Sequence, residues 1–225
     1  MEAFASFFDR YGALLAQGTV DTLVMTLVST LFAYVIGIPL GVALVVTAPG
    51  GLRPNRVVNA VLGWIVNIGR SMPFIILMVA LIPLTRLLVG TSLGWQAACV
   101  PLTIAAAPFV ARLVESSLSE IDNGVVEAAK CMGATNGQII LRVMLPESLP
   151  SLIRGLSITT ITLIGYSAMA GAAGAGGLGD IAMRYGFHRY EPKVMILTII
   201  LLIVIVCLIQ IIFDHLAARV DKRNR

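Results

Sequence analysis

Long apolar runs follow one another along the chain, separated by short polar stretches. An α-helix needs about 20 apolar residues to cross the hydrocarbon core of a bilayer, and five runs are close to this length or longer. The sequence therefore predicts an all-α integral membrane protein with a single transmembrane domain over residues 1–225. Its five spans are expected near Leu23–Thr47, Val57–Leu84, Ala97–Val114, Leu152–Ala170 and Val194–Phe213.

The second and fourth runs differ from simple spans. The second is too long for one straight crossing and contains Pro73, so we expect a kink there and the first turns at the membrane interface. The fourth is the least hydrophobic of the five. An outer-membrane barrel would instead require alternating strands of about 10 residues, a pattern that these continuous runs lack. Residues 1–18 are mixed in polarity and do not have the basic start and apolar core of a cleavable signal peptide.

Composition and charge give the orientation. Hydrophobic residues make up 58% of the chain and charged residues 12%, whereas charged residues are about a quarter of an ordinary soluble domain. Most Lys and Arg residues fall on one side of the membrane if the tail "ARVDKRNR" is inside, and such an excess is typical of the cytoplasmic side. We therefore expect an external N-terminus, a cytoplasmic C-terminus and a cytoplasmic loop over residues 115–150.

The same basic balance indicates contacts with anionic lipid and does not point to nucleic acid. The three cysteines, Cys99, Cys131 and Cys207, are scattered and lack the spacing of metal ligands. The sequence therefore predicts no metal site and no catalytic residues.

The cytoplasmic loop contains an organised polar stretch, "EAAKCMGATNGQIILRVMLP", residues 127–146. Asp122 or Asn123 is suited to cap a short helix, and Gly133 is suited to end it. Apolar residues at helical spacing from Ile139 to Met144 then predict a second amphipathic helix, which two prolines follow at positions 146 and 150. On this pattern alone, the stretch could equally be an interfacial hairpin that lies on the lipid headgroups.

The full spacing favours another interpretation. Glu127, Ala128 and Ala129 are followed after three residues by Gly133, and after nine more by "VMLP", which contains Leu145 and Pro146. This resembles the EAA loop of permease subunits in ATP-binding-cassette (ABC) importers, E-A-A-x3-G-x9-I-x-L-P. The sequence departs from that pattern only at Val143, where the pattern has Ile. We refer to residues 115–150 as the EAA loop.

The resemblance extends over most of the chain. Residues 18–44, 69–94, 106–118 and 165–187 look like the corresponding parts of methionine-type ABC importer permeases. It implies the type I importer permease fold, a homodimer around a central pathway and a location in the bacterial inner membrane. It also implies two copies of a cytoplasmic ABC ATPase and an external substrate-binding protein as partners. Pattern alone does not name the substrate, so another amino acid or small solute stays open.

The resemblance also implies roles for the loop residues. The short helix of the EAA loop would be the coupling helix, which docks in a groove of the ATPase. Small residues at Ala128, Ala129 and Gly133 would let it sit deep in that groove, and Glu127 would pair with or cap groups there. The chain has no Walker A motif. ATP and Mg²⁺ are therefore expected on the separate ATPase chain, with no cofactor on this one.

Further residues in the spans and at their edges are candidates for the pathway or for structural contacts. By resemblance, Met169 is the candidate for a narrow gate in the pathway, and Tyr166 and Ser167 are expected beside it; core packing and hydrogen bonds to the helix's own carbonyls are the alternatives. Arg70 in "RSMP" resembles a structural Arg-x-x-Pro that ends in Pro73, and we favour a bracing role over substrate contact. Arg112 and Glu115, three residues apart, are expected to form an ion pair.

Other interpretations receive less support. "GAGGLG", residues 174–179, matches a dinucleotide fingerprint, but it follows a span instead of a β-strand, so we expect close backbone packing there. A secondary transporter would usually have acidic residues in its spans and internal repeats, and neither is evident. An intramembrane protease would need a paired nucleophile and base at membrane depth, and the spans contain no such pair.

Overall fold

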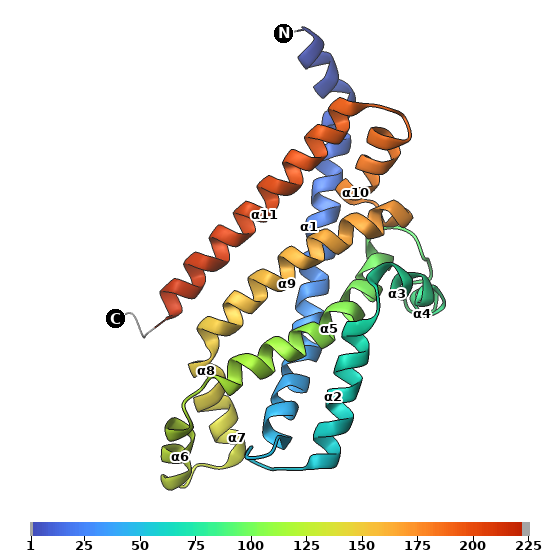
Figure 1. Cartoon of the computed structure of the whole chain (residues 1–225). Helices are drawn as coiled ribbons and strands as arrows, with labels where there is room; N and C mark the ends of the chain where they lie inside the picture. Colours follow the sequence, from blue (N-terminus) through green and yellow to red (C-terminus); the bar gives the residue numbers. More distant parts are fainter. Residues whose placement is uncertain (1, 222–225) are drawn as a thin grey trace. The chain divides into compact units, whose positions relative to one another are not determined.

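The computed structural model describes residues 2–221, with side chains from Asp9 onward. The part of the chain that it describes is helical, without β-strands. Figure 1 traces the elements in chain order. The basic tail residues Lys222, Arg223 and Arg225, which contributed to the expected orientation, lie outside the described residues.

The first half of the chain forms α1 (Glu2–Thr47), α2 (Arg56–Ser71), α3 (Phe74–Ala80), α4 (Ile82–Val89) and α5 (Trp95–Ser119). The EAA loop then forms α6 (Asn123–Cys131), α7 (Asn136–Ile139), the π-helical segment η1 (Ile140–Met144) and α8 (Leu145–Glu147). The remaining elements are α9 (Leu149–Ala170), η2 (Gly171–Ala175), α10 (Gly177–Ile181), η3 (Ala182–Phe187) and α11 (Pro192–Val220).

Four stretches are long and apolar enough to cross a membrane, and a bent pair formed by α2 and α3 makes up to five. The four are Asp9–Thr47, Trp95–Ser119, Leu149–Ala175 and Pro192–Val220. The third has the lowest mean hydropathy of the four, 1.4, as expected for the fourth predicted span. Pro73 lies between α2 and α3, so the expected break in the second run is confirmed.

The first helix is longer than the apolar pattern predicts. We expected a span from Leu23, but α1 begins at Glu2. The reason is tertiary packing: Tyr11 and Leu15 are buried, and the Tyr11 hydroxyl donates a hydrogen bond to Glu191 at 3.4 Å. Contacts of this kind stabilise helical turns that hydropathy alone would not assign.

The chain folds into two compact units, and each collects three separate stretches. Unit 1 comprises residues 1–31, 72–105 and 160–209, and unit 2 comprises residues 32–71, 106–159 and 210–225. The helices α1, α5, α9 and α11 each contribute one part to each unit. A single permease domain over the whole chain stays a prediction.

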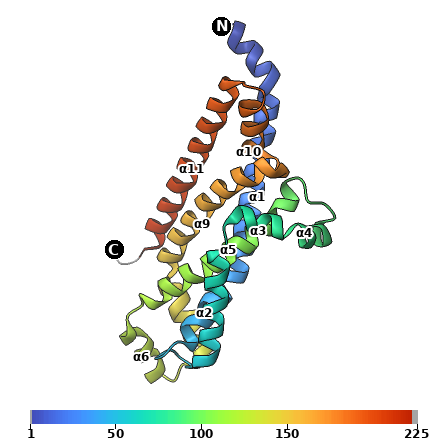
Figure 2. The same ribbon diagram turned by 45° about the vertical axis from the view of Figure 1, so that its right-hand side comes forward.

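In unit 1, α10 packs on the first half of α1, and both ribbon views place the two side by side (Figures 1 and 2). The backbone N–H of Leu178 donates to Thr22 Oγ1 at 2.9 Å. The "GAGGLG" stretch makes the close backbone approach that we expected: a Cβ at Gly179 would lie 2.5 Å from the carbonyl oxygen of Ala168. A side chain there would collide with α9 instead of leaving space for a nucleotide.

In unit 2, the second half of α1 packs closely against α5. A Cβ at Gly41 would lie 2.6 Å from the Ala111 carbonyl oxygen, so glycine allows the two backbones to approach. Leu44, Val66 and Ala111 form a buried cluster at this contact. The EAA loop continues from the end of α5, so a packed base of three helices, α1, α2 and α5, carries it.

Candidate functional site

The first helix of the EAA loop, α6, starts at the expected cap. The Asp122 carboxylate accepts a hydrogen bond from the backbone N–H of Gly124 at 2.7 Å. This bond satisfies one of the N–H groups that the first turn of a helix leaves free. The cap fixes where α6 begins after the three-residue connection from α5.

Gly133 ends α6 by a left-handed turn. Its φ is +79°, a conformation that residues with a side chain rarely adopt. The N–H of Gly133 donates to the Lys130 carbonyl at 2.9 Å, and the N–H of Ala134 donates to the Ala129 carbonyl at 3.1 Å. These two bonds make a complete Schellman motif. The expected stop at Gly133 is confirmed.

A capping box that the sequence analysis missed starts the next helix, α7. Thr135 Oγ1 accepts from the Gln138 N–H at 3.4 Å, and Gln138 Oε1 accepts from the Thr135 N–H at 2.9 Å. The signal was present as "TNGQ", which matches the S/T-x-x-E/Q pattern of a capping box. Together, the Schellman motif and the capping box fix the turn between α6 and α7.

The second helix of the loop is not a uniform α-helix. It passes from α7 into the wider π-helical segment η1 and then into α8, which has Pro146 in its first turn. Proline lacks the N–H that would continue an α-helical ladder, and its ring clashes with the preceding turn. A π-helical segment is one way in which a helix accommodates such an interruption.

The parts of the EAA pattern meet in space around one apolar hollow. It measures about 470 Å³ and lies between α6 and η1, which are in contact. In Figure 1, α6 lies beside α7, with which it is in contact. The hollow is lined by Asp122, Gly124, Val125, Ala128, Ala129, Met132 and Val143. Ala128 and Ala129 from one end of the pattern and Val143 from the other thus share a single surface, which we call the α6 hollow.

The rim of the hollow leaves apolar side chains uncovered. Met132 is 81% exposed, whereas Ala129 is only 3% exposed. Glu127 and Ala128 on α6 are exposed as well, as is Pro146, and Leu145 is half-buried. Exposed apolar groups around a hollow, with a carboxylate nearby, suit the docking of another protein.

The loop was also considered as a possible metal site. Among the described residues, no group of three or more His, Cys, Asp or Glu side chains could hold a metal ion. The loop presents hydrophobic surface and backbone turns instead of converging ligands. Such a surface is suited to contact with another apolar surface.

The three expected pathway residues lie near the end of α9. Met169 is 50% exposed, as a residue that meets a partner or lines a pathway would be in a single chain. Tyr166 stacks on Phe74, with ring centroids 4.7 Å apart and planes inclined by 4°. Ser167 is buried, and its hydroxyl donates to the Ile164 carbonyl at 2.7 Å, which is the backbone-bonded alternative. Of the three, Met169 is the most exposed.

Arg70 and Pro73 lie on either side of the break after α2. Pro73 precedes the first residue of α3, with extended backbone at ψ 130°. Arg70 is in the last turn of α2, and its side chain is exposed. Within residues 9–221, where side chains are described, no ion pair of Arg70 is found. Its bracing role stays a prediction.

The expected ion pair between Arg112 and Glu115 forms, with Nη1 and Oε2 2.5 Å apart. The structure adds a partner that spacing did not predict: Arg112 Nη2 donates to Asn67 Oδ1 on α2 at 2.9 Å. Asn67 and Arg112 are 45 positions apart in sequence. Periodicity reports contacts within one helix, so it carries no signal for this one.

Comparison with known proteins agrees with these features. The family model described as "Binding-protein-dependent transport system inner membrane component" matches residues 37–223. The probable D-methionine transport system permease protein MetI of Vibrio cholerae is 53% identical over 219 residues, which cover 97% of each chain. The D-methionine transport system permease protein MetI of Escherichia coli K12 is 56% identical over 158 residues, 70% of this chain and 73% of the relative.

Solved structures give the same result. An inward-facing conformation of the MetNI methionine ABC transporter contains a chain that is 51% identical to this one, with a TM-score of 0.93. The match covers 95% of this chain and 99% of that one. An amino acid ABC transporter crystallised with histidines shares the fold at a TM-score of 0.72 and 18% identity.

Proposed function

The chain belongs to the family of binding-protein-dependent transport system inner membrane components, and from this premise we propose that it is the membrane-spanning permease subunit of an ATP-driven methionine importer. The substrate is inferred from relatives named for D-methionine transport, one of which is 53% identical over nearly the full length. D-methionine, L-methionine or both are the proposed substrates. The type I importer permease fold and the multi-pass helical character fit this role.

The chain is a transport subunit and not itself an ATPase. In the proposed complex, two copies of the chain pair around a central pathway, and a cytoplasmic ATPase subunit docks under each copy. ATP and Mg²⁺ belong to that ATPase. An external binding protein delivers methionine, as the description of the family implies for its members. The proposed orientation places the N-terminus outside and the EAA loop inside.

The α6 hollow is the observation that carries the proposed coupling role. A docking helix must offer small residues, so that it can lie deep in a partner's groove, and apolar groups that desolvate there. Ala128 and Ala129 supply the small residues, and the exposed Met132 supplies the apolar contact. The hollow also includes Val143 of η1, the segment that leads through α8 to α9. A displacement of α6 by the ATPase would therefore be passed on to α9.

Methionine would pass between the two copies near Met169. A thioether is apolar and flexible, so a Met169 side chain from each copy would close a narrow gate without a fixed hydrogen bond. Arg70 and Pro73 have structural roles in this proposal and do not contact the substrate. Tyr166 and Ser167 support the gate from behind, through the Phe74 stack and the bond to Ile164.

The docking role is tested by a charge reversal at Glu127. The chain is co-expressed with its ATPase and purified, and the amount of ATPase that co-purifies is measured. Loss of a desolvated charge-assisted contact should weaken the association by about tenfold or more in Glu127→Lys. Glu120→Lys is the matched control, because Glu120 is an exposed glutamate of the same loop that lies outside α6, the proposed docking helix. Equal retention of the ATPase by both variants would contradict the proposed docking surface.

A further inference from the structure

We propose that Asn67, Arg112 and Glu115 form a positioning contact, the α2–α5 tie, which makes the last turns of α5, where the EAA loop starts, move together with α2. The inference rests on the proposed function, because it concerns how movement of the loop reaches the membrane-spanning helices. Arg112 acts through its neighbours and does not touch substrate. All three residues belong to unit 2.

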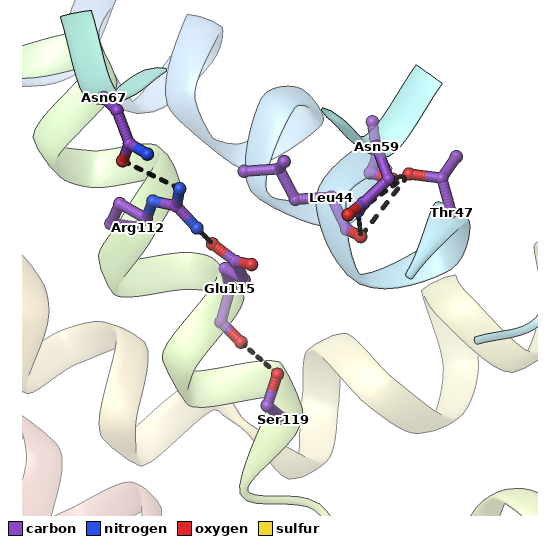
Figure 3. Close-up of polar contacts among 8 residues, drawn as sticks. Leu44, Thr47, Asn59, Asn67, Arg112, Glu115 and Ser119 are labelled. Atoms are coloured by element: carbon purple, nitrogen blue, oxygen red, sulfur yellow. Dashed lines mark hydrogen bonds and ion pairs between the residues drawn. The ribbon is translucent and has the colours of Figure 1, made fainter. Parts of the chain in front are cut away.

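The tie is a fork of two hydrogen bonds from one guanidinium. Arg112 donates through Nη2 to Asn67 Oδ1 at 2.9 Å and through Nη1 to Glu115 Oε2 at 2.5 Å (Figure 3). Because the guanidinium is planar and rigid, two bonds in different directions fix its orientation as well as its distance from α2. A lysine would provide a point charge without this geometry.

Beside the tie, the backbone of α2 also packs closely on a side chain of α5. A Cβ on Gly69 of α2 would lie 2.6 Å from Pro108 Cγ on α5. At its other end, α2 is bound to α1: Asn59 Nδ2 donates to the Leu44 carbonyl at 2.8 Å (Figure 3). The parts of α1, α2 and α5 in unit 2 are therefore held together at three points along their length.

The tie lies at the start of the EAA loop, whose first residue is Glu115. Glu115 and Ser119 are in the last turns of α5, and the Ser119 hydroxyl donates to the Glu115 carbonyl at 2.7 Å. The two ends of the loop are also joined, because the hydroxyls of Ser117 and Ser151 are hydrogen-bonded at 2.9 Å. Movement of α6 would therefore act on the end of α5 and the start of α9 together. Arg112 links this end of α5 to α2.

Stability alone does not account for the arrangement. The Arg112 and Glu115 side chains are 28% and 25% exposed, and an ion pair three residues apart on a partly exposed helix contributes little to folding. Its main effect is geometric: it holds the guanidinium where Asn67 accepts its second bond. Removing Asn67 should therefore affect transmission more than assembly.

The test uses the complete transporter, with the ATPase and the binding protein, in proteoliposomes. Methionine uptake per ATP hydrolysed is measured for Asn67→Ala, Asn67→Asp, Arg112→Met and Arg112→Lys. Asn67→Ala and Arg112→Met should lower this ratio by about three- to tenfold, the range expected along a coupling network. Asn67→Asp should restore it, because a carboxylate accepts the same bond. Arg112→Lys should restore it only in part.

Assembly and thermal stability are followed in the same samples. Arg86→Met is the matched control, because Arg86 is an exposed arginine on α4 whose hydrogen bond to Ser92 lies outside both the tie and the EAA loop. This variant should leave the ratio unchanged. An unchanged ratio in Asn67→Ala, with or without reduced stability, would overturn the tie as a positioning contact. Failure of the proposed function would look different, because the wild-type complex itself would show no ATP-dependent methionine uptake.

Discussion

Gly133 is the residue whose backbone conformation most constrains the EAA loop. Its φ of +79° places α7 against the end of α6, and a Cβ there would meet no atom within 4 Å. Replacing Gly133 would therefore strain the backbone conformation, but the new side chain would not clash with other atoms of the chain. This strain costs roughly 1–2 kcal/mol for an ordinary residue, and Asn tolerates this conformation better.

We expect Gly133→Ala to loosen the turn and to weaken ATPase retention, while Gly133→Asn stays closer to wild type. Retention of the ATPase during purification, together with hydrogen exchange of residues 129–139, measures both effects. If the Asn variant lost the ATPase as completely as the Ala variant, the side chain itself would be clashing with the partner. The positive φ would then not be the reason for glycine.

At the scale of elements, the capping box at the start of α7 can be tested by mutation independently of Gly133. Thr135→Ala removes a cap, which typically costs about 1 kcal/mol, whereas Thr135→Ser keeps the accepting hydroxyl. We expect faster hydrogen exchange over residues 136–140 in the Ala variant and near wild-type exchange in the Ser variant. Identical exchange in the two variants would show that the capping box does not hold this turn.

The sequence predicted elements well where a local rule governs the chain. The cap at Asp122, one of the two residues proposed for it, and the stop at Gly133 were predicted because caps and stops depend on residue type at fixed positions. Hydropathy predicted a span near Leu23–Thr47 but not the earlier turns of α1, because those are stabilised by tertiary contacts such as that between Tyr11 and Glu191. The partner of Arg112 was missed for the same reason, since Asn67 lies on another helix.

At the scale of the whole molecule, topology follows from the charge asymmetry and can be tested by labelling. Tyr190, which is 86% exposed before α11, is expected outside, and the exposed Asn136 of the EAA loop inside. Single cysteines at these two positions are compared in a background without the native cysteines. A membrane-impermeant reagent applied to intact cells should modify Tyr190→Cys and leave Asn136→Cys unmodified. The reverse pattern would place the EAA loop outside, where no ATPase could reach it.

The expected dimer gives a second prediction at this scale. The sequence shows no internal repeat, so we expect two-fold symmetry to come from a second copy of the chain. In the same cysteine-free background, Met169→Cys should cross-link between copies in at least one nucleotide state. Ile158→Cys is a useful comparison, because Ile158 is equally exposed on α9 at 50% but lies three turns earlier. Dimers that persist without any cross-link at position 169 would remove Met169 from the gate.

The central claim is that this chain forms the pathway of an ATP-driven methionine importer. Its most direct measurement is the uptake of labelled methionine into proteoliposomes that contain the chain, its ATPase and ATP, with the binding protein supplied outside. Methionine should accumulate against its gradient only when both ATP and the binding protein are present. Methionine accumulation that is the same with and without ATP would contradict the claim. An assembled complex that hydrolyses ATP and imports another solute but no methionine would contradict it as well.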